Sequence, residues 1–333
     1  MDETTSTGNE TVAPQGNEIR RLGVLGMAGA IYTYLLVVYG GIVRITGAGM
    51  GCGDDWPRCN GRVVPEMDFI TFIEYSHRVL AAGLALLTLW VVVSAIRNRD
   101  EPEVAGKGGL LRPALLAGAL ILLQVVLGAV TVKLELLAGT TTLHFVTAMA
   151  LLATFSILAV RAGLFDAGLT EAGRGPFTGA AMSAAVLGFV VVAFGALTAN
   201  LGMEGPYPPS GAAMACQGFP LCNGELWPDG GAWVHTHWTH RLLAYLLFFH
   251  VLGAGAVTLR RSPPPALAHA AWATMGLVVL QVVVAAFLVL THLPQALQGL
   301  HLAVGAALWG ALAVWVGLAR RADGRVSPVV VSG

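Results

Sequence analysis

The sequence predicts an all-α integral membrane protein, with eight transmembrane helices arranged as two pseudo-symmetric four-helix bundles. Hydrophobic residues make up 56% of the 333-residue chain and charged residues only 11%, whereas a soluble domain carries about 25% charged residues. Apolar runs long enough to span a bilayer recur along the chain, and motifs of the first half return in the second. The formal net charge of zero gives no indication of nucleic-acid binding.

Eight apolar segments each approach or exceed the about 17–25 residues that a spanning helix needs. They cover residues 22–45, 71–96, 111–133, 140–161, 178–201, 232–259, 266–290 and 297–319. Arginine and lysine gather in alternate loops and next to the first and last segments, and basic loops stay in the cytoplasm. We therefore expect a multi-pass cell-membrane protein with both termini cytoplasmic, with residues 1–20 as a disordered tail and residues 323–333 as a second tail.

The two halves repeat each other. The segment Glu74–Arg78 corresponds to His237–Arg241, and the twenty residues from Gln124 to His144 recur between Gln281 and His301. Each half has four predicted helices and starts in the cytoplasm, which indicates a parallel duplication about an axis normal to the membrane. The expected domains are an N-terminal bundle, residues 21–175, and a C-terminal bundle, residues 176–322.

Four histidines occupy one layer of the predicted membrane region. His77, His144, His240 and His301 each lie within about ten residues of the outer end of a span, which is about 15 Å at the rise of an α-helix. Two imidazoles that project into a four-helix bundle are a common way to hold a heme axially. Copper and zinc also bind imidazole but favour further cysteine or carboxylate ligands, and only Glu74 is available nearby. The pattern predicts heme ligation in both halves.

Glu74 distinguishes the first half from the second. It precedes His77 by one helical turn, so the two side chains share a face, whereas the matching position of the repeat is His237. An ionisable residue within a span marks a functional site by default. The difference predicts one catalytic or substrate-binding half and one electron-carrying half. The alternative is that Glu74 only pairs with Arg78 or a neighbouring helix.

Other polar residues near this layer have more than one interpretation. Arg78 and Arg241 directly follow the candidate ligands, and they are expected either to bind heme propionates or to extend to the membrane interface. Gln124 and Gln281 are expected to form interhelical hydrogen bonds. Structural or surface roles are expected for the histidines at His235, His250, His269 and His292.

All four cysteines fall in the two long outer loops, residues 46–70 and 202–231. They are Cys52, Cys59, Cys216 and Cys222. An oxidising outer compartment permits disulfides there. Four cysteines allow three pairings, of which one pair within each loop is the most economical.

These motifs resemble the heme A synthase family over nearly the whole chain after residue 20. The run Gly40–Cys52 followed by Asp55–Cys59 is similar to the family's first outer loop, and Glu74–Arg78 is similar to its motif on helix two. Leu127–Val132 and the pair Leu143-His144 resemble its helices three and four. One departure is an extra residue between Cys52 and Asp55, where the family's proline is also missing.

The resemblance implies a membrane oxidoreductase that oxidises a ring methyl of heme o to the formyl group of heme A, for terminal oxidase assembly. It implies that His77 and His144 hold the substrate heme, and that His240 and His301 hold the iron of a heme b. The reactive carboxylate maps onto Glu74, and the loop cysteines map onto the four cysteines named above. The implied partners are heme o and heme A, an electron partner, the heme o synthase and cytochrome oxidase assembly.

Two other functions fit part of the sequence. A b-type diheme electron-transfer protein explains the four histidines but leaves the asymmetric Glu74 unexplained. A heme transporter or chaperone is expected to carry a tryptophan-rich outer motif, and Trp56, Trp227 and Trp233 are not clustered. The sequence therefore favours the enzyme.

Overall fold

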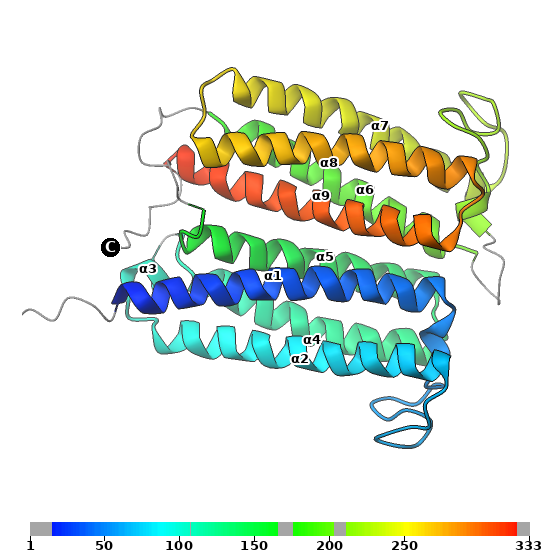
Figure 1. The fold of residues 1–333 in the computed structure, drawn as a ribbon, viewed down its shortest axis with the longest axis horizontal. Coiled ribbons are helices and arrows are strands. Elements are labelled where there is room, and N and C mark those ends of the chain that lie inside the picture. The colour runs from blue at the N-terminus through cyan, green and yellow to red at the C-terminus, as the bar shows by residue number, and fades with distance from the viewer. Residues whose placement is uncertain (1–14, 107, 166–175, 203–210, 325–333) are drawn as a thin grey trace, which may run out of the picture.

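The computed structural model describes residues 15–106, 108–165, 176–202 and 211–324. Eight helices in this part of the chain are long and apolar enough to cross a membrane, as the sequence predicts. Figure 1 shows them side by side. Their bounds are α1 (Gln15–Ile45), α2 (Phe69–Arg97), α4 (Leu111–Lys133), α5 (Ala138–Arg161), α6 (Thr178–Asn200), α7 (Ala232–Leu259), α8 (Pro265–Leu290) and α9 (Gln295–Ala322).

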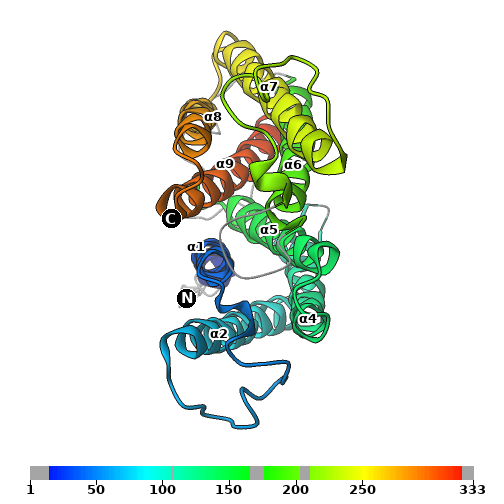
Figure 2. The ribbon, with the colours of Figure 1, turned by 90° about the vertical axis from the view of Figure 1, so that its right-hand side faces the viewer.

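The long helices pack as two groups of four. Helices α1, α2, α4 and α5 pack against one another, as do α6, α7, α8 and α9 (Figures 1 and 2). The groups meet where α1 and α5 face α6 and α9. Phe155 of α5 and Trp315 of α9 are fully buried and belong to one apolar core that runs through both groups.

Hydrogen bonds cross the contact between the two groups. Trp309 Nε1 donates to the carbonyl of Met149 over 2.7 Å, and Arg321 Nη1 donates to the carbonyl of Val160 over 2.6 Å. Both donors lie on α9 and both acceptors on α5. Apolar lipid offers no driving force for helix association, so such polar bonds contribute to holding helices together.

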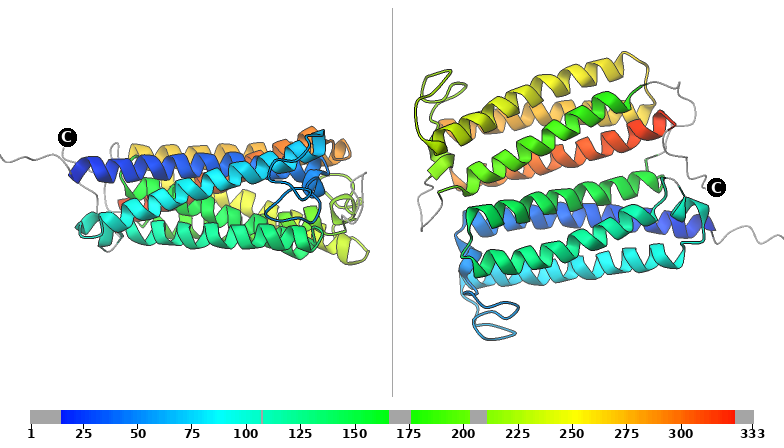
Figure 3. Two further views of the ribbon diagram at one scale, coloured as in Figure 1. Left: turned by 90° about the horizontal axis from the view of Figure 1, so that it is seen from below. Right: turned by 180° about the vertical axis from the view of Figure 1, so that it is seen from behind.

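The short elements lie between the long helices. They are the 3-10 turns η1 (Ala48–Met50) and η2 (Gly211–Met214) and the one-turn helix α3 (Pro102–Ala105). Both long loops leave the same end of the molecule, opposite the start of α1 (Figure 3). Asp68 caps α2, because its Oδ1 accepts a hydrogen bond from the backbone N–H of Thr71 over 2.8 Å.

The helix α1 extends into the expected N-terminal tail, since it begins at Gln15. Residues 1–14 of that tail lie outside the described residues, as do residues 325–333 of the expected C-terminal tail. Asp323 follows α9 directly and caps another helix. Its carboxylate accepts the backbone N–H groups of Phe177 and Thr178, at the start of α6, over 2.9 Å each.

Candidate functional site

A cavity of about 2070 Å³ lies among the helices of both groups. His77, His144, His240 and His301 all line it, and so does Glu74. The structure therefore brings together the four predicted ligands and the predicted catalytic carboxylate. A pocket for one small molecule usually has about 300–1,000 Å³, so this cavity has room for more than one large group.

The four histidines lie at matched depths. His77 and His240 each stand eight residues after the start of their helices, α2 and α7. His144 and His301 each stand six residues after the start of α5 and α9. At the rise of an α-helix these positions are about 12 Å and about 9 Å from the outer helix ends. The predicted layer is thus present in the structure.

Glycines leave space beside three of these imidazole rings. A Cβ atom at Gly40 would lie 3.1 Å from His77 Nε2, and one at Gly195 would lie 2.9 Å from His240 Cε1. A Cβ atom at Gly128 would lie 3.6 Å from His144 Cε1. Any larger residue at the first two positions would push the ring aside. The residue pattern alone did not assign these glycines to the site, although Gly40 and Gly195 hold matching places near the ends of α1 and α6.

The two repeat-matched glutamines form the predicted interhelical bonds. Gln124 Nε2 donates to the backbone carbonyl of His144 over 2.8 Å. Gln281 Nε2 donates to the backbone carbonyl of His301 over 3.1 Å. Each bond joins the third helix of a bundle to the fourth at the candidate ligand itself, and so fixes the height of that histidine.

The donor set fits a heme better than a metal ion held by protein alone. In the described part of the chain, no group of three or more His, Cys, Asp or Glu residues is placed to hold a metal ion. A heme iron takes four nitrogens from its own ring and needs only two axial ligands, which a pair of histidines supplies. Among the described residues the buried Nδ1 atoms of His144 and His240 have no hydrogen-bond partner, so these rings have unused capacity.

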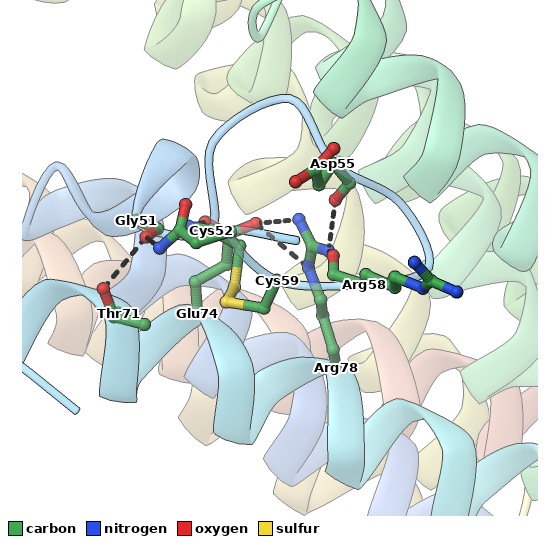
Figure 4. A network of polar contacts seen from close by, with 9 residues as sticks. Gly51, Cys52, Asp55, Arg58, Cys59, Thr71, Glu74 and Arg78 are labelled. Atoms are coloured by element: carbon green, nitrogen blue, oxygen red, sulfur yellow. Dashed lines mark hydrogen bonds and ion pairs between the residues drawn. A yellow bond between two sulfur atoms is a disulfide. The ribbon is translucent and has the colours of Figure 1, made fainter. Parts of the chain in front are cut away.

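Glu74 holds the first outer loop against α2 (Figure 4). Its Oε2 accepts the backbone N–H of Cys52 over 2.8 Å, and its Oε1 accepts hydrogen bonds from Nε and Nη2 of Arg78. The side chain is almost fully buried and also lines the cavity. The pairing with Arg78 that the alternative interpretation expects therefore exists, and the carboxylate also lines the same cavity as His77.

Both candidate propionate ligands hold loop carbonyls in place. Arg78 Nη1 donates to the carbonyls of Asp55 and Arg58, as Figure 4 shows. Arg241 Nη1 donates to the carbonyls of Gly218 and Leu221, which precede it by the same intervals. Among the described residues Arg241 Nε is buried without a partner, because the second half has no carboxylate at the position of Glu74. Propionate binding by either arginine stays a prediction.

The chain matches the family model COX15-CtaA, described as cytochrome oxidase assembly protein, over residues 23–313. This protein belongs to the COX15-CtaA family. It is 31% identical over 309 residues to the heme A synthase of Symbiobacterium thermophilum, an alignment that covers 88% of this chain and 94% of that protein. It is 30% identical over 241 residues to the heme A synthase of Alkalihalophilus pseudofirmus, covering 70% and 75% of the two chains. The corresponding enzyme of Halalkalibacterium halodurans is 29% identical over 246 residues, covering 73% and 78%.

The loops of this COX15-CtaA protein each close on their own disulfide, as predicted. Cys52 pairs with Cys59, and Cys216 pairs with Cys222. The Cα–Cα distances of 4.4 Å and 4.8 Å lie in the usual range for disulfides. The extra residue of the first loop lies within its disulfide ring, because the cysteines are 7 residues apart there and 6 apart in the second loop. Residues 203–210 of the second expected loop lie outside the described residues.

Two further histidines of this family member make structural contacts. His250 Nε2 lies 2.9 Å from Ser183 Oγ, which joins α7 to α6, in agreement with its expected structural role. His237 lines the cavity and its Nδ1 lies 2.9 Å from the carbonyl of Ala212. His237 thus fastens its own outer loop to the second bundle, as Glu74 does in the first.

Proposed function

We propose that this protein is a heme A synthase, which oxidises a ring methyl of heme o to the formyl group of heme A. One observation carries the proposal: two repeat-matched pairs of histidines line one cavity, and only the first pair has a carboxylate beside it. The name heme A synthase of its relatives agrees with this arrangement.

The two bundles would have different roles, one binding the substrate and the other a redox heme. In the bundle of residues 21–175, His77 and His144 would hold the substrate heme o. In the bundle of residues 176–322, His240 and His301 would hold heme b, which supplies one-electron redox chemistry when bound. The glutamine bonds to the carbonyls of His144 and His301 support both pairs. They hold each axial ligand at a fixed height.

Glu74 is the residue of this chain that would act on the reacting methyl group. Conversion of a methyl to a formyl group replaces two hydrogens of one carbon by an oxygen atom, so a base beside that carbon assists by accepting a proton. A carboxylate oxygen can accept more than one hydrogen bond. Oε2 of Glu74 accepts one from Cys52, so it retains capacity for a proton. The same negative charge would stabilise positive charge that develops at the reacting carbon.

The positive-inside pattern supports an orientation with both termini in the cytoplasm. The histidine layer and both disulfide loops would then lie near the outer face, where an oxidising compartment favours disulfides. Heme A made at this site would serve terminal oxidase assembly. The proposed partners are a heme o synthase, which supplies the substrate, and an electron acceptor for the second bundle.

Heme analysis tests the proposal. The full chain is expressed in cells that contain a heme o source, and the hemes are extracted and separated by chromatography. We expect heme A in the cells, and heme b together with heme o or heme A in the purified protein. A purified protein that holds two hemes b, from cells without heme A, would instead favour the diheme electron-transfer protein.

A further inference from the structure

The cavity reaches the lipid-facing surface in the first half. Ala82 and Leu86 of α2 and Val125 of α4 line the cavity and are also exposed, Leu86 to 69% and Val125 to 42%. In the second half every described residue that lines the cavity is buried or half-buried. An opening between α2 and α4, which we call the α2–α4 gap, therefore has no counterpart between α7 and α8.

Comparison of the two repeats identifies the side chains that differ between the exposed cavity lining of the first half and the covered lining of the second. Counting from His77 and His240, Leu84 corresponds to Leu247, and both line the cavity. Ala85, which also lines the cavity, corresponds to Phe248. Phe248 is half-buried and packs against the apolar core. A methyl group that lines the cavity in the first half thus corresponds to an aromatic ring that does not line it in the second.

A second pair shows the same change one turn closer to the outer face. Ala82 corresponds to Tyr245, which is half-buried. The hydroxyl of Tyr245 donates to the carbonyl of Pro220 over 2.6 Å, so the ring is fixed in place. Two alanines of the first half therefore correspond to two large aromatic residues of the second half.

The α2–α4 gap extends from the histidine layer toward the middle of the membrane, since Val125 of α4 adjoins Gln124, which bonds the carbonyl of His144. Ala85 and Leu86 follow His77 by eight and nine residues, which is about 12–14 Å along the helix. Only an apolar group is stable there, because an unsatisfied polar group in hydrocarbon costs several kcal/mol. The gap joins the part of the cavity where the buried Nδ1 of His144 has no partner among the described residues.

We infer that the α2–α4 gap takes the farnesyl chain of heme o, and that Tyr245 and Phe248 restrict the second half to a heme without this chain. The inference rests on the proposed function. Heme o differs from heme b in carrying this long hydrocarbon chain. With its ring near His77 and His144, the substrate extends its chain sideways through the gap into the hydrocarbon layer. An amphipathic substrate then reaches the site without leaving the bilayer.

The test replaces the alanines by their repeat counterparts. Purified Ala85→Phe and Ala82→Tyr proteins, which retain the heme of the second half, are titrated with heme o and with heme b. We expect heme o binding in the first half to weaken by roughly tenfold or more, because an inserted ring overfills the gap. Heme b, which has no farnesyl chain, is expected to bind the first half as in wild type. Leu89→Phe is the matched control, since Leu89 is exposed on α2 outside the cavity lining.

The outcomes separate the two proposals. Wild-type affinity for heme o in both variants would overturn the inference, as would an equal loss of heme o and heme b. Retention of the second-half heme shows that a variant is folded. If Ala85→Phe does not retain that heme, the Ala82→Tyr variant tests the inference instead. A wild-type protein that binds no heme o and makes no heme A would instead overturn the proposed function.

Discussion

Arg78 donates from both Nε and Nη2 to one oxygen of Glu74, which lies one turn earlier on α2. The other oxygen accepts the backbone N–H of Cys52. The carboxylate thus connects the first disulfide loop to the helix that carries His77. In the second half Arg241 keeps the loop contacts but has no carboxylate to bind.

The first prediction concerns the Glu74 carboxylate. Glu74→Gln keeps the shape of the side chain but removes its charge and basicity. General acid–base catalysis usually contributes about 10²–10⁴-fold, so heme A formation should fall by that order and heme o should accumulate. The heme of the second half should stay bound. Extraction and chromatography of cellular hemes measures this, with the exposed Glu66→Gln as control. A wild-type yield of heme A would leave Glu74 with a structural role only.

The second prediction concerns the histidine pairs. His240→Ala and His301→Ala should each lose the tightly held heme of the second half, because a single axial bond does not replace two. The same substitution at His77 should leave that heme in place. Heme content per protein and the low-spin absorption spectrum measure the effect. Normal heme content and an unchanged spectrum in both second-half variants would contradict the assignment.

The third prediction concerns the outer loops. Peptide mapping of the unreduced protein by mass spectrometry should recover Cys52 linked to Cys59 and Cys216 linked to Cys222, as the structure places them. A reduced sample is the control. Recovery of a peptide that links the first loop to the second would show a different pairing in the cell.

The fourth prediction concerns the interhelical bond of Gln124. Gln124→Leu removes the donor to the carbonyl of His144, and interhelical bonds in membranes contribute about 0.6–2 kcal/mol. The melting temperature of the detergent-solubilised protein should therefore fall. Leu122→Ala is the control, because Leu122 lies on the lipid-facing side of the same helix. An equal or smaller effect of Gln124→Leu would mean that the bond adds no stability.

The fifth prediction concerns pH and the cap of α2. The backbone N–H of Thr71, with its hydroxyl, holds the pKa of Asp68 below its ordinary value of 3.8. A lowered carboxylate pKa stabilises the folded state above the unfolded pKa, and this stabilisation is lost as the pH falls through the folded value. The first turn of α2 should therefore lose this stabilisation as the pH falls below the ordinary value of 3.8. Hydrogen exchange at Thr71 measures it, and Asp68→Asn, which caps without titrating, should abolish the pH dependence.

The helices were predictable from the sequence because hydrophobic length determines them in a membrane. The expected segments 111–133 and 232–259 coincide with α4 and α7. The histidine layer was predictable for the same reason, since a fixed rise per residue converts position into depth. The helix α3 was missed because four residues between two spans carry no hydrophobic period.

The loop partners of Arg78 and Arg241 were not predictable in this way. Both bind backbone carbonyls, and the direction of a carbonyl depends on loop conformation, which carries no side-chain signature. The exchange of Ala85 for Phe248 is visible in the repeat. Its meaning appears only once the structure shows that Ala85 lines the cavity and Phe248 does not.

The cap that Asp323 provides determines when, during synthesis of the chain, the second bundle can be completed. All residues of the first four long helices precede residue 162, so that bundle can assemble while the ribosome is still translating the second. The second bundle needs Asp323 to close the start of α6, and it contains His301, which would hold the proposed heme. It is therefore complete only when translation passes the end of α9, and the proposed heme of that bundle would bind tightly only after nearly the whole chain is made.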